Sequence, residues 1–361
     1  MKRAVPLAVL SAFLGLAPTF AQTPAPSRLV NLSTRARLAA ANPLISGFAI
    51  AGTGTRTVLV RAVGPGLAAF GVTDAVAAPR LELRDAAGEI LATNSGWAGS
   101  TTLATAFAQA GAFPFSAGSA DAAALVTLPA GTYTVHVADA TGGIALAEVY
   151  DLGGASGNAR LVNVSTRASV AAGSEVISGF VIEGAESRQF LLRGVGPGLN
   201  RLGVNGVLVD PALSLFDSLG RELAANDNWS GTRVAVTATS TSNQAAASLA
   251  AAVVGAVSGG TAPGVGAVSP NQTSTAMQVA VASAIVSAAV QGAANAQLAT
   301  AAETGARVTA ASTASGAFAL DLLSNDAALV TPLGAGAYTV VVNAKASSAP
   351  GLALLEIYEL P

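Results

Sequence analysis

The sequence predicts an all-β protein made of two tandem antiparallel β-sandwich modules, of jelly-roll or immunoglobulin-like type, with an Ala-rich helical insertion in the second. Three observations predict this. A long internal repeat runs through the chain, apolar residues alternate with period two inside each copy, and an Ala-rich segment occurs in one copy only.

The N-terminal segment has the pattern of a secretory signal. Lys2 and Arg3 precede an apolar run over residues 4–16, and Thr19 and Ala21 place small residues at the −3 and −1 positions of a cleavage site. We therefore expect residues 1–21 to be a signal peptide and residues 22–27 a linker. This predicts a protein that works in the periplasm, at the cell surface or outside the cell.

The composition restricts the possible partners. Charged residues form 11% of the chain and the formal net charge is −2, so no basic field is present to hold nucleic acid. The chain has no cysteine, so burial of apolar surface rather than disulfide bonding must stabilise it after export. We expect the partner to be a protein or a glycan at the cell envelope, with no nucleic acid bound.

The internal repeat has an offset of 132 residues. Residues 28–99 align without a gap on residues 160–231, and 36 of these 72 positions are identical. Such similarity predicts the same fold for both copies. We expect module 1 to span residues 28–153, a linker 154–159, and module 2 residues 160–361.

Within each copy the pattern is that of short half-buried strands. Leu81 and Leu83 alternate with charged neighbours, and Tyr133, Val135 and Val137 alternate with polar ones. Gly- and Pro-rich turn signals separate the strands at residues 52–54, 64–66, 85–88 and 129–131. This predicts about eight strands per copy and favours a two-sheet sandwich.

Near their ends the copies realign at offsets of 205 to 208, so the second copy carries about 73 additional residues (205 − 132). We place this insertion at about residues 237–310. Residues 245–257 and 276–302 are Ala-rich, and Ala is the best helix former. They predict a helical hairpin whose apolar stripe docks on the module, on a second chain or on a membrane surface.

The repeated motifs also resemble a known type of module. Both copies contain Leu-Val-Asn-(Leu/Val)-Ser-Thr-Arg, Ile-Ser-Gly-Phe, Arg-x-Val-Gly-Pro-Gly-Leu and Asn-x-x-Trp, and they close on Gly-x-Tyr-Thr-Val and Glu-(Val/Ile)-Tyr. This pattern resembles a β-sandwich repeat of large exported and surface proteins from Verrucomicrobia-like bacteria. The resemblance implies an accessory, adhesive or structural role without catalytic residues.

A more distant resemblance is to the bacterial pre-peptidase C-terminal domain. It depends on Asp210–Leu215, on Asn226–Trp229 and on the late Gly-x-Tyr-Thr-Val strand. The first copy departs from that pattern, with Ala78 in place of Asp210 and Ser95 in place of Asp227.

The tryptophans are candidate ligand-binding residues. Trp97 and Trp229 occupy equivalent positions in the two copies. An exposed indole can stack on a sugar ring, whereas a buried one closes the end of a sandwich core with its N–H bonded locally. We favour the buried role and keep a sugar platform as the alternative.

Calcium is a second candidate ligand, and no other cofactor is expected. Hard oxygen atoms of the kind that calcium prefers gather in module 2 on Asp210, Asp217, Asn226 and Asp227. Asp and Asn are also the usual residues of turns, and we favour the turn interpretation.

No catalytic set is evident in the sequence, and we predict that the protein is not an enzyme. His136 is the only histidine, and the alternation places it on the solvent side of its strand. Gly64-Pro65-Gly66, followed by Asp85, fits a dinucleotide fingerprint weakly, and we favour a structural turn. A hydrolase would require a pocket that gathers several acidic residues.

Charged residues recur in strands that are apolar on both faces. Arg61 and Glu148 occupy such positions in the first copy, and Arg193 and Glu356 in the second. A buried charge is tolerated mainly when it is paired and hydrogen-bonded. We expect each Arg to be buried against its Glu or against turn carbonyls, with Arg35 and Arg167 as competing partners for the carboxylates.

The sequence thus favours a non-catalytic exported protein with a structural or adhesive role. The alternative is a carbohydrate-binding protein, or accessory domains of a secreted hydrolase system.

Overall fold

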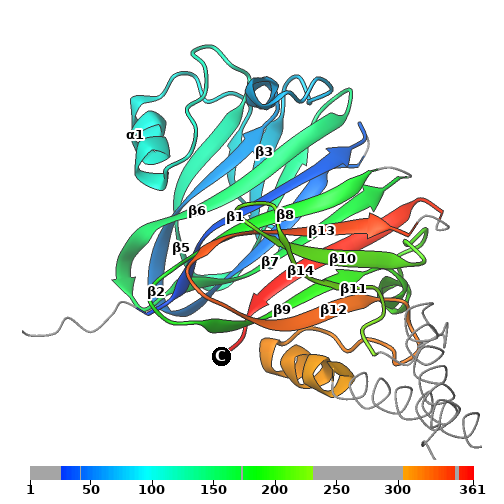
Figure 1. Cartoon of the computed structure of the whole chain (residues 1–361). Helices are drawn as coiled ribbons and strands as arrows, with labels where there is room; N and C mark the ends of the chain where they lie inside the picture. Colours follow the sequence, from blue (N-terminus) through cyan, green and yellow to red (C-terminus); the bar gives the residue numbers. More distant parts are fainter. Residues whose placement is uncertain (1–25, 41, 172–173, 231–303, 346–348) are drawn as a thin grey trace, which may run out of the picture.

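The computed structural model describes residues 26–40, 42–171, 174–230, 304–345 and 349–361. The predicted signal peptide therefore lies outside the described residues, as do both Ala-rich segments of the predicted helical hairpin. The described part is mostly β, as expected for an all-β protein, and its strands run through both repeats (Figure 1).

Among the described residues, six strands come from the first repeat and eight from the second. Those of the first repeat are β1 (Arg28–Leu38), β2 (Leu44–Val63), β3 (Arg80–Asp85), β4 (Ile90–Asn94), β5 (Ala122–Ala138) and β6 (Gly143–Gly157). Those of the second are β7 (Arg160–Val170), β8 (Glu175–Glu183), β9 (Arg188–Val195), β10 (Pro211–Asp217), β11 (Glu222–Asn226), β12 (Ala327–Leu333), β13 (Gly336–Ala344) and β14 (Gly351–Glu359).

Short helices also recur in the two repeats. Two 3-10 helices, η1 (Pro65–Phe70) and η2 (Pro197–Leu202), follow the Arg-containing strands, and one α-helix, α1 (Thr101–Ala110), belongs to the first repeat. Residues 304–315 form a second α-helix. In Figure 1 the two α-helices lie outside the sheet at opposite ends of the molecule, cyan at the top and orange at the bottom.

The two repeats exchange strands with each other. Strand β1 pairs with β8 of the second repeat, from Arg28 opposite Glu183 to Arg35 opposite Ile177. The first half of β2 pairs in the same way with β7, from Ile45 opposite Arg167 onward. All fourteen strands of the described residues therefore belong to one sheet.

The pairing of β1 with β6 and β7, and of β2 with the same two strands, closes the sheet on itself. A closed sheet with strands from both repeats is a different arrangement from two separate sandwich modules, and that finer prediction is not confirmed. The segment that joins the repeats is also shorter than the linker predicted at residues 154–159, because β6 extends to Gly157 and β7 begins at Arg160.

One main core serves both repeats. It includes Leu32 and Phe48 of the first repeat and Val164 and Phe180 of the second. At its centre the hydroxyl of Thr34 lies 2.7 Å from that of Thr166, the equivalent residue at an offset of 132 (166 − 34). Equivalent positions of the repeats thus meet inside the molecule, because β1 and β7, the first strands of the two repeats, are in contact.

Each repeat also has a smaller apolar cluster outside the sheet, under its own helix. The first contains Trp97 and Phe107 of α1, and the second contains Trp229, Val308 and Ala311. Val308 is 1% exposed, so the helix at 304–315 is part of the fold rather than of the insertion. The predicted insertion end at about 310 is therefore too late, because helix 304–315 is the counterpart of α1.

Candidate functional site

Both tryptophans are buried core residues. Trp97 is 7% exposed and donates its indole N–H to the carbonyl of Ser116 at 3.1 Å. Trp229 is 2% exposed and donates to the carbonyl of Asp321 at 3.0 Å. Neither ring offers an open face to a sugar, so the tryptophan platform does not exist in this fold.

Replacement of Trp229 by phenylalanine tests this role. The variant keeps an aromatic ring in the cluster but loses the N–H donor, which should cost about 1 kcal/mol of unfolding free energy. Binding to any external ligand should be unchanged. Urea unfolding gives the first quantity, and a loss of binding at unchanged stability would contradict the structural role.

Three of the four residues proposed for calcium, Asp217, Asn226 and Asp227, use their side-chain oxygens within the protein. A carboxylate oxygen of Asp217 accepts from the backbone N–H groups of Leu219 and Arg221 and forms the turn between β10 and β11. The side-chain oxygen of Asn226 accepts from the N–H of Ala328 at 3.0 Å and joins two strands. Both residues thus have turn and bridging roles.

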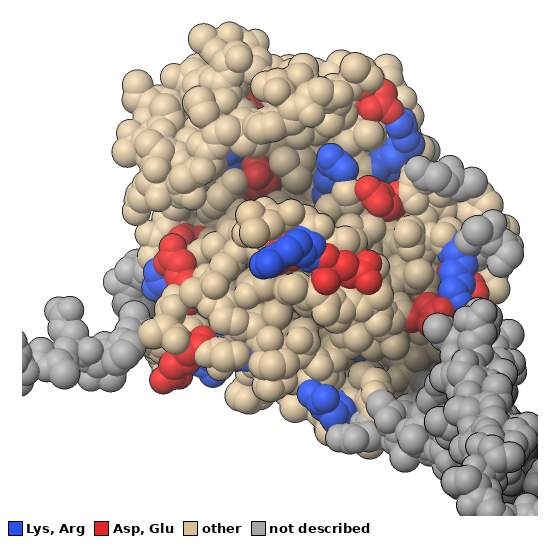
Figure 2. All heavy atoms as spheres, viewed as in Figure 1, with Lys and Arg blue, Asp and Glu red and all other residues tan. Residues whose placement is uncertain are grey.

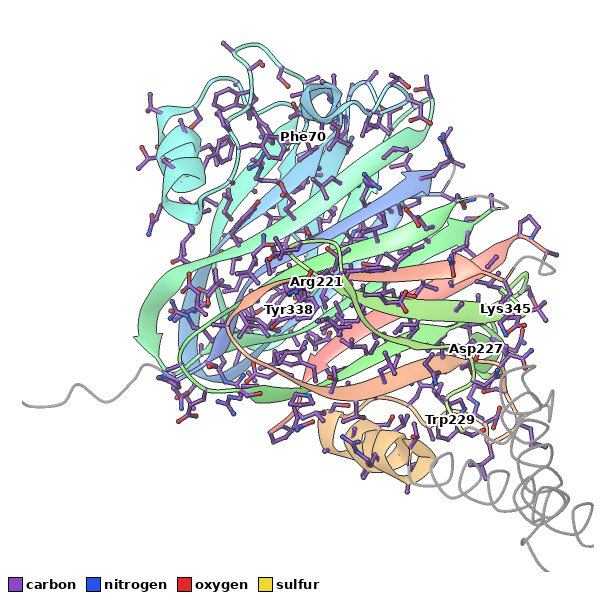
Figure 3. All side chains as sticks on the ribbon, viewed as in Figure 1. Phe70, Arg221, Asp227, Trp229, Tyr338 and Lys345 are labelled. Atoms are coloured by element: carbon purple, nitrogen blue, oxygen red, sulfur yellow. The ribbon has the colours of Figure 1, made fainter. Side chains whose placement is uncertain are left out.

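Asp227 and Asp210 surround a cation that the chain already supplies. Lys345 forms an ion pair with Asp227, and the two lie side by side in Figure 3. The hydrogen bond with Asp227 raises the pKa of Lys345, and the charge of Asp210 adds to the effect. Within the described residues, no group of three or more His, Cys, Asp or Glu could hold a metal ion.

His136 of β5 lies directly opposite Glu82 of β3. It lies half-buried on the outer face of β5, with its ring nitrogen 3.1 Å from the hydroxyl of Thr134. Burial lowers the pKa of His136, and the charge of Arg84 adds to this effect. The carboxylates nearby are paired, since Glu82 bonds Arg84 at 2.6 Å.

Each buried arginine lies beside its predicted glutamate. The Nε of Arg61 lies 3.2 Å from Oε2 of Glu148, and Arg193 and Glu356 repeat that distance. Both guanidinium groups are 0% exposed. Burial raises the pKa of Glu148 and of Glu356 and lowers that of Arg61.

The surroundings of the two arginines differ between the repeats. The guanidinium carbon of Arg61 lies 4.1 to 4.7 Å from three ring centroids, those of Phe107, Phe113 and Phe115. That of Arg193 lies over a single ring, Phe318, at 4.3 Å. These groups contact rings and a carboxylate inside the protein, so their role is structural. Arg35 and Arg167 form no ion pair among the described residues.

The Gly-Pro-Gly turns are held by aspartates that the sequence analysis did not single out. Asp121 is 0% exposed, and its carboxylate accepts from the N–H of Gly64 at 2.7 Å and of Gly66 at 3.0 Å. Asp326 does the same for Gly196 and Gly198. A carboxylate of the chain itself thus occupies the turn where a dinucleotide would place its phosphate. The detectable signal was the recurrence of this aspartate at an offset of 205 (326 − 121).

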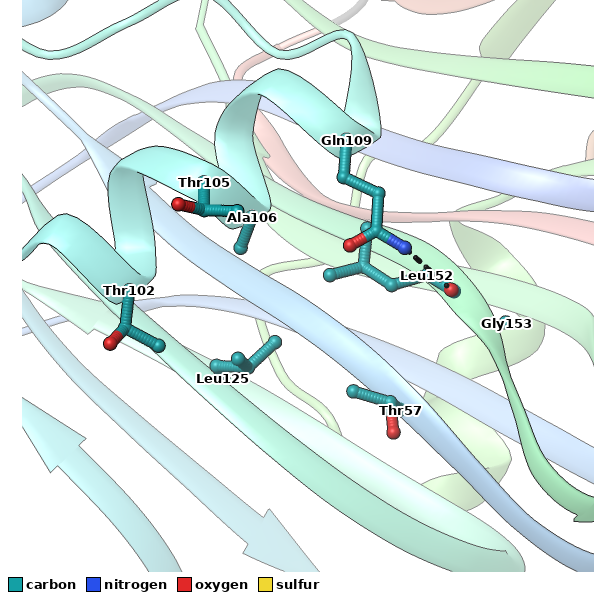
Figure 4. Close-up of a pocket in the computed structure, with 8 residues that line it drawn as sticks. All are labelled: Thr57, Thr102, Thr105, Ala106, Gln109, Leu125, Leu152 and Gly153. Atoms are coloured by element: carbon teal, nitrogen blue, oxygen red, sulfur yellow. Dashed lines mark hydrogen bonds between the residues drawn. The ribbon is translucent and has the colours of Figure 1, made fainter.

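Within the described residues, a groove beside α1 is open to a ligand. It consists of two adjoining hollows of about 500 Å³ each, which share Gln109, Leu152 and Gly153. The first hollow is drawn in Figure 4, where Thr57, Thr102, Thr105, Ala106 and Leu125 also line it. The second is lined further by Arg28, Val30, Asn31, Ala110, Gly111, Tyr150, Asp151, Val181 and Glu183. We call both together the α1 groove.

The α1 groove crosses the sheet and both repeats. Its floor passes in turn over Leu125 of β5, Thr57 of β2, Leu152 of β6 and Asn31 of β1, and it ends at Val181 of β8. These five strands are consecutive neighbours in the sheet. The far end belongs to the second repeat, so residues of both repeats line the groove.

At the equivalent place in the second repeat an arginine replaces a threonine. At an offset of 205, Thr102 corresponds to Arg307 and Leu125 to Val330 (307 − 102 and 330 − 125). Arg307 extends over the strand and donates to the carbonyl of Val330 at 3.4 Å. Gln109 corresponds to Ala314 in the same alignment. The polar side chains of Thr102 and Gln109 are thus particular to the first repeat.

No family model matches this chain, and no curated protein matches it significantly. The resemblance to exported β-sandwich repeats therefore stays a prediction. In the part of the chain that the structure describes, no helix is both long and apolar enough to span a membrane.

Proposed function

We propose that this is an exported, non-catalytic β-rich repeat protein with a structural or adhesive role at the cell surface or outside the cell. The observation that supports the proposal most strongly is the α1 groove, which both repeats build together. A concave site of this size is the usual location for ligand contact in a protein. The partner would be a protein or a glycan of the cell envelope.

The rest of the surface fits this role. Charged groups are scattered singly or in opposite-sign pairs over the face shown in Figure 2, and most of that face is uncharged. Such a surface gives weak long-range attraction, so binding must depend on close contact in a shaped site. A sheet that is shared between both repeats supplies a rigid frame for that site without cysteines.

The variant Thr102→Arg tests whether the groove makes the contact. Arginine occupies the equivalent position 307, where the same fold accommodates it, so the variant should fold normally and close the first hollow. We expect its binding to isolated cell envelopes to fall at least ten-fold. Sedimentation of the purified protein with envelope fragments measures this.

Thr313→Arg is the matched control, since Thr313 is an exposed residue of helix 304–315 far along the chain from the groove. It adds the same charge without closing the hollow and should bind like the original protein. Equal binding by all three proteins would rule out the α1 groove as the contact site.

A further inference from the structure

We infer that the α1 groove binds a segment of an uncharged polysaccharide, laid across the strands of the sheet. The inference rests on the proposed function and names the ligand class of the same site. It uses the chemistry, the charge and the direction of the groove rather than the tryptophans, which are buried.

The side chains around the groove suit a chain of neutral hydroxyl groups. Thr57, Thr102 and Thr105 provide hydroxyls. That of Thr105 donates to the carbonyl of Thr101 at 3.0 Å and that of Thr57 lies 2.9 Å from the hydroxyl of Thr127, so both keep lone pairs that can accept. Gln109 provides an amide. The amide nitrogen of Gln109 donates to the carbonyl of Leu152 at 3.2 Å, which fixes its direction and leaves its oxygen as an acceptor. Sugar hydroxyls pair with groups of this kind.

The groove has no net charge. Arg28 and Glu183 lie 3.5 Å apart at its far end and neutralise each other. Asp151 contributes no free charge, because its side chain is 0% exposed and bonds Nε of Arg56 at 2.6 Å. An anionic or cationic polymer would find no complementary charge here, whereas a neutral polymer needs none and can compensate the desolvation of its hydroxyls by hydrogen bonds.

The direction of the groove argues against a peptide. An extended peptide usually binds by adding a strand to a sheet edge, which requires unpaired backbone groups. The strands under the α1 groove are paired with each other, and the groove runs across them. Its length over these five strands is about 19 Å, with roughly 4.8 Å between neighbouring strands. This accommodates a short run of sugar residues.

The experiment is affinity electrophoresis in gels that contain one polysaccharide each. The neutral probes are dextran, laminarin, galactomannan and hydroxyethyl cellulose, and the charged probes are alginate and polygalacturonate. We expect at least one neutral probe to retard the protein and neither charged probe to do so. Thr102→Arg should weaken that binding at least ten-fold and Gln109→Ala several-fold, while Thr313→Arg should leave it unchanged.

The converse variant gives an independent readout. Arg307→Thr removes the arginine at the second-repeat position, and it should leave binding by the first repeat intact. It therefore separates a groove effect from a general effect of charge on the helices.

The outcomes separate this inference from the proposed function. If no neutral probe binds while envelope binding still depends on Thr102, the ligand is of another class, such as a protein, and the inference is wrong. Retardation by the charged probes alone would also overturn it. If Thr102→Arg also leaves envelope binding unchanged, the groove neither contacts the envelope nor binds a polysaccharide.

Discussion

Replacement of Arg193 by alanine should lower the free energy of unfolding by about 3–5 kcal/mol. The guanidinium is 0% exposed and lies 3.2 Å from the carboxylate of Glu356, which is itself buried. Without Arg193, that carboxylate loses its only cationic neighbour in the described ion pairs, and burial opposes its charge. Chemical denaturation measures the loss.

Two further variants separate charge from packing. Arg221→Ala removes an exposed arginine that is paired with Asp217 and should leave stability nearly unchanged, as is usual for surface pairs. The double variant Arg193→Met/Glu356→Leu removes both buried charges and should recover most of the stability that Arg193→Ala loses. The ion-pair interpretation is wrong if Arg193→Ala costs no more than Arg221→Ala.

Loss of the Asp326 carboxylate should have a similarly large effect. It accepts from the N–H groups of Gly196 at 2.8 Å and Gly198 at 3.0 Å, and Asp326→Ala leaves both buried donors unpaired. Each unpaired donor costs about 1–3 kcal/mol, so we expect a total of roughly 2–6 kcal/mol. Thermal unfolding should show a clear fall in midpoint.

Asp326→Asn keeps one side-chain oxygen as an acceptor, so it should lose less than the alanine variant. Asp321→Ala is the control, because that side chain is exposed and pairs with Arg201 at the surface. If Asp326→Ala unfolds at the same temperature as Asp321→Ala, the carboxylate does not support the Gly-Pro-Gly turn.

Much of the local structure could be predicted from the sequence. The period-two alternation of Tyr133, Val135 and Val137 places these residues in one strand, where Tyr133 and the two valines are buried. The positions of Arg61 and Glu148 among apolar neighbours predicted a buried pair, and the two residues face each other on β2 and β6. Such features depend on the local pattern of apolar, polar and charged residues, and a single sequence contains that pattern.

The exchange of strands could not be predicted in this way. Half of the aligned positions are identical between the repeats, so β1 has nearly the same side-chain pattern opposite it in β8 as in the first half of β2. Alternation fixes which face a residue occupies but not which strand lies beside it. The far end of the α1 groove, at Val181, lies on β8 through that exchange, so the contribution of both repeats to the groove was invisible as well.

The aspartates of the turns were missed for a related reason. Asp121 is 55 residues from Gly66 (121 − 66), and no local pattern joins a turn to a carboxylate at that distance. Only the recurrence of the same pairing in the second repeat, as Asp326 with Gly198, marks it as structural.

The exchange of strands between repeats is tested most directly by cross-linking, for which a chain without cysteines is well suited. Arg35 lies opposite Ile177 of the other repeat, so Arg35→Cys/Ile177→Cys should form an intramolecular disulfide. Separate modules would instead place Arg35 beside Ile45, the equivalent of Ile177 in its own repeat (177 − 132). On non-reducing gels at low protein concentration, we predict a faster-migrating oxidised monomer for 35/177 and none for Arg35→Cys/Ile45→Cys. A disulfide in the 35/45 pair, with none in the 35/177 pair, would contradict the exchange and remove the basis of the composite groove.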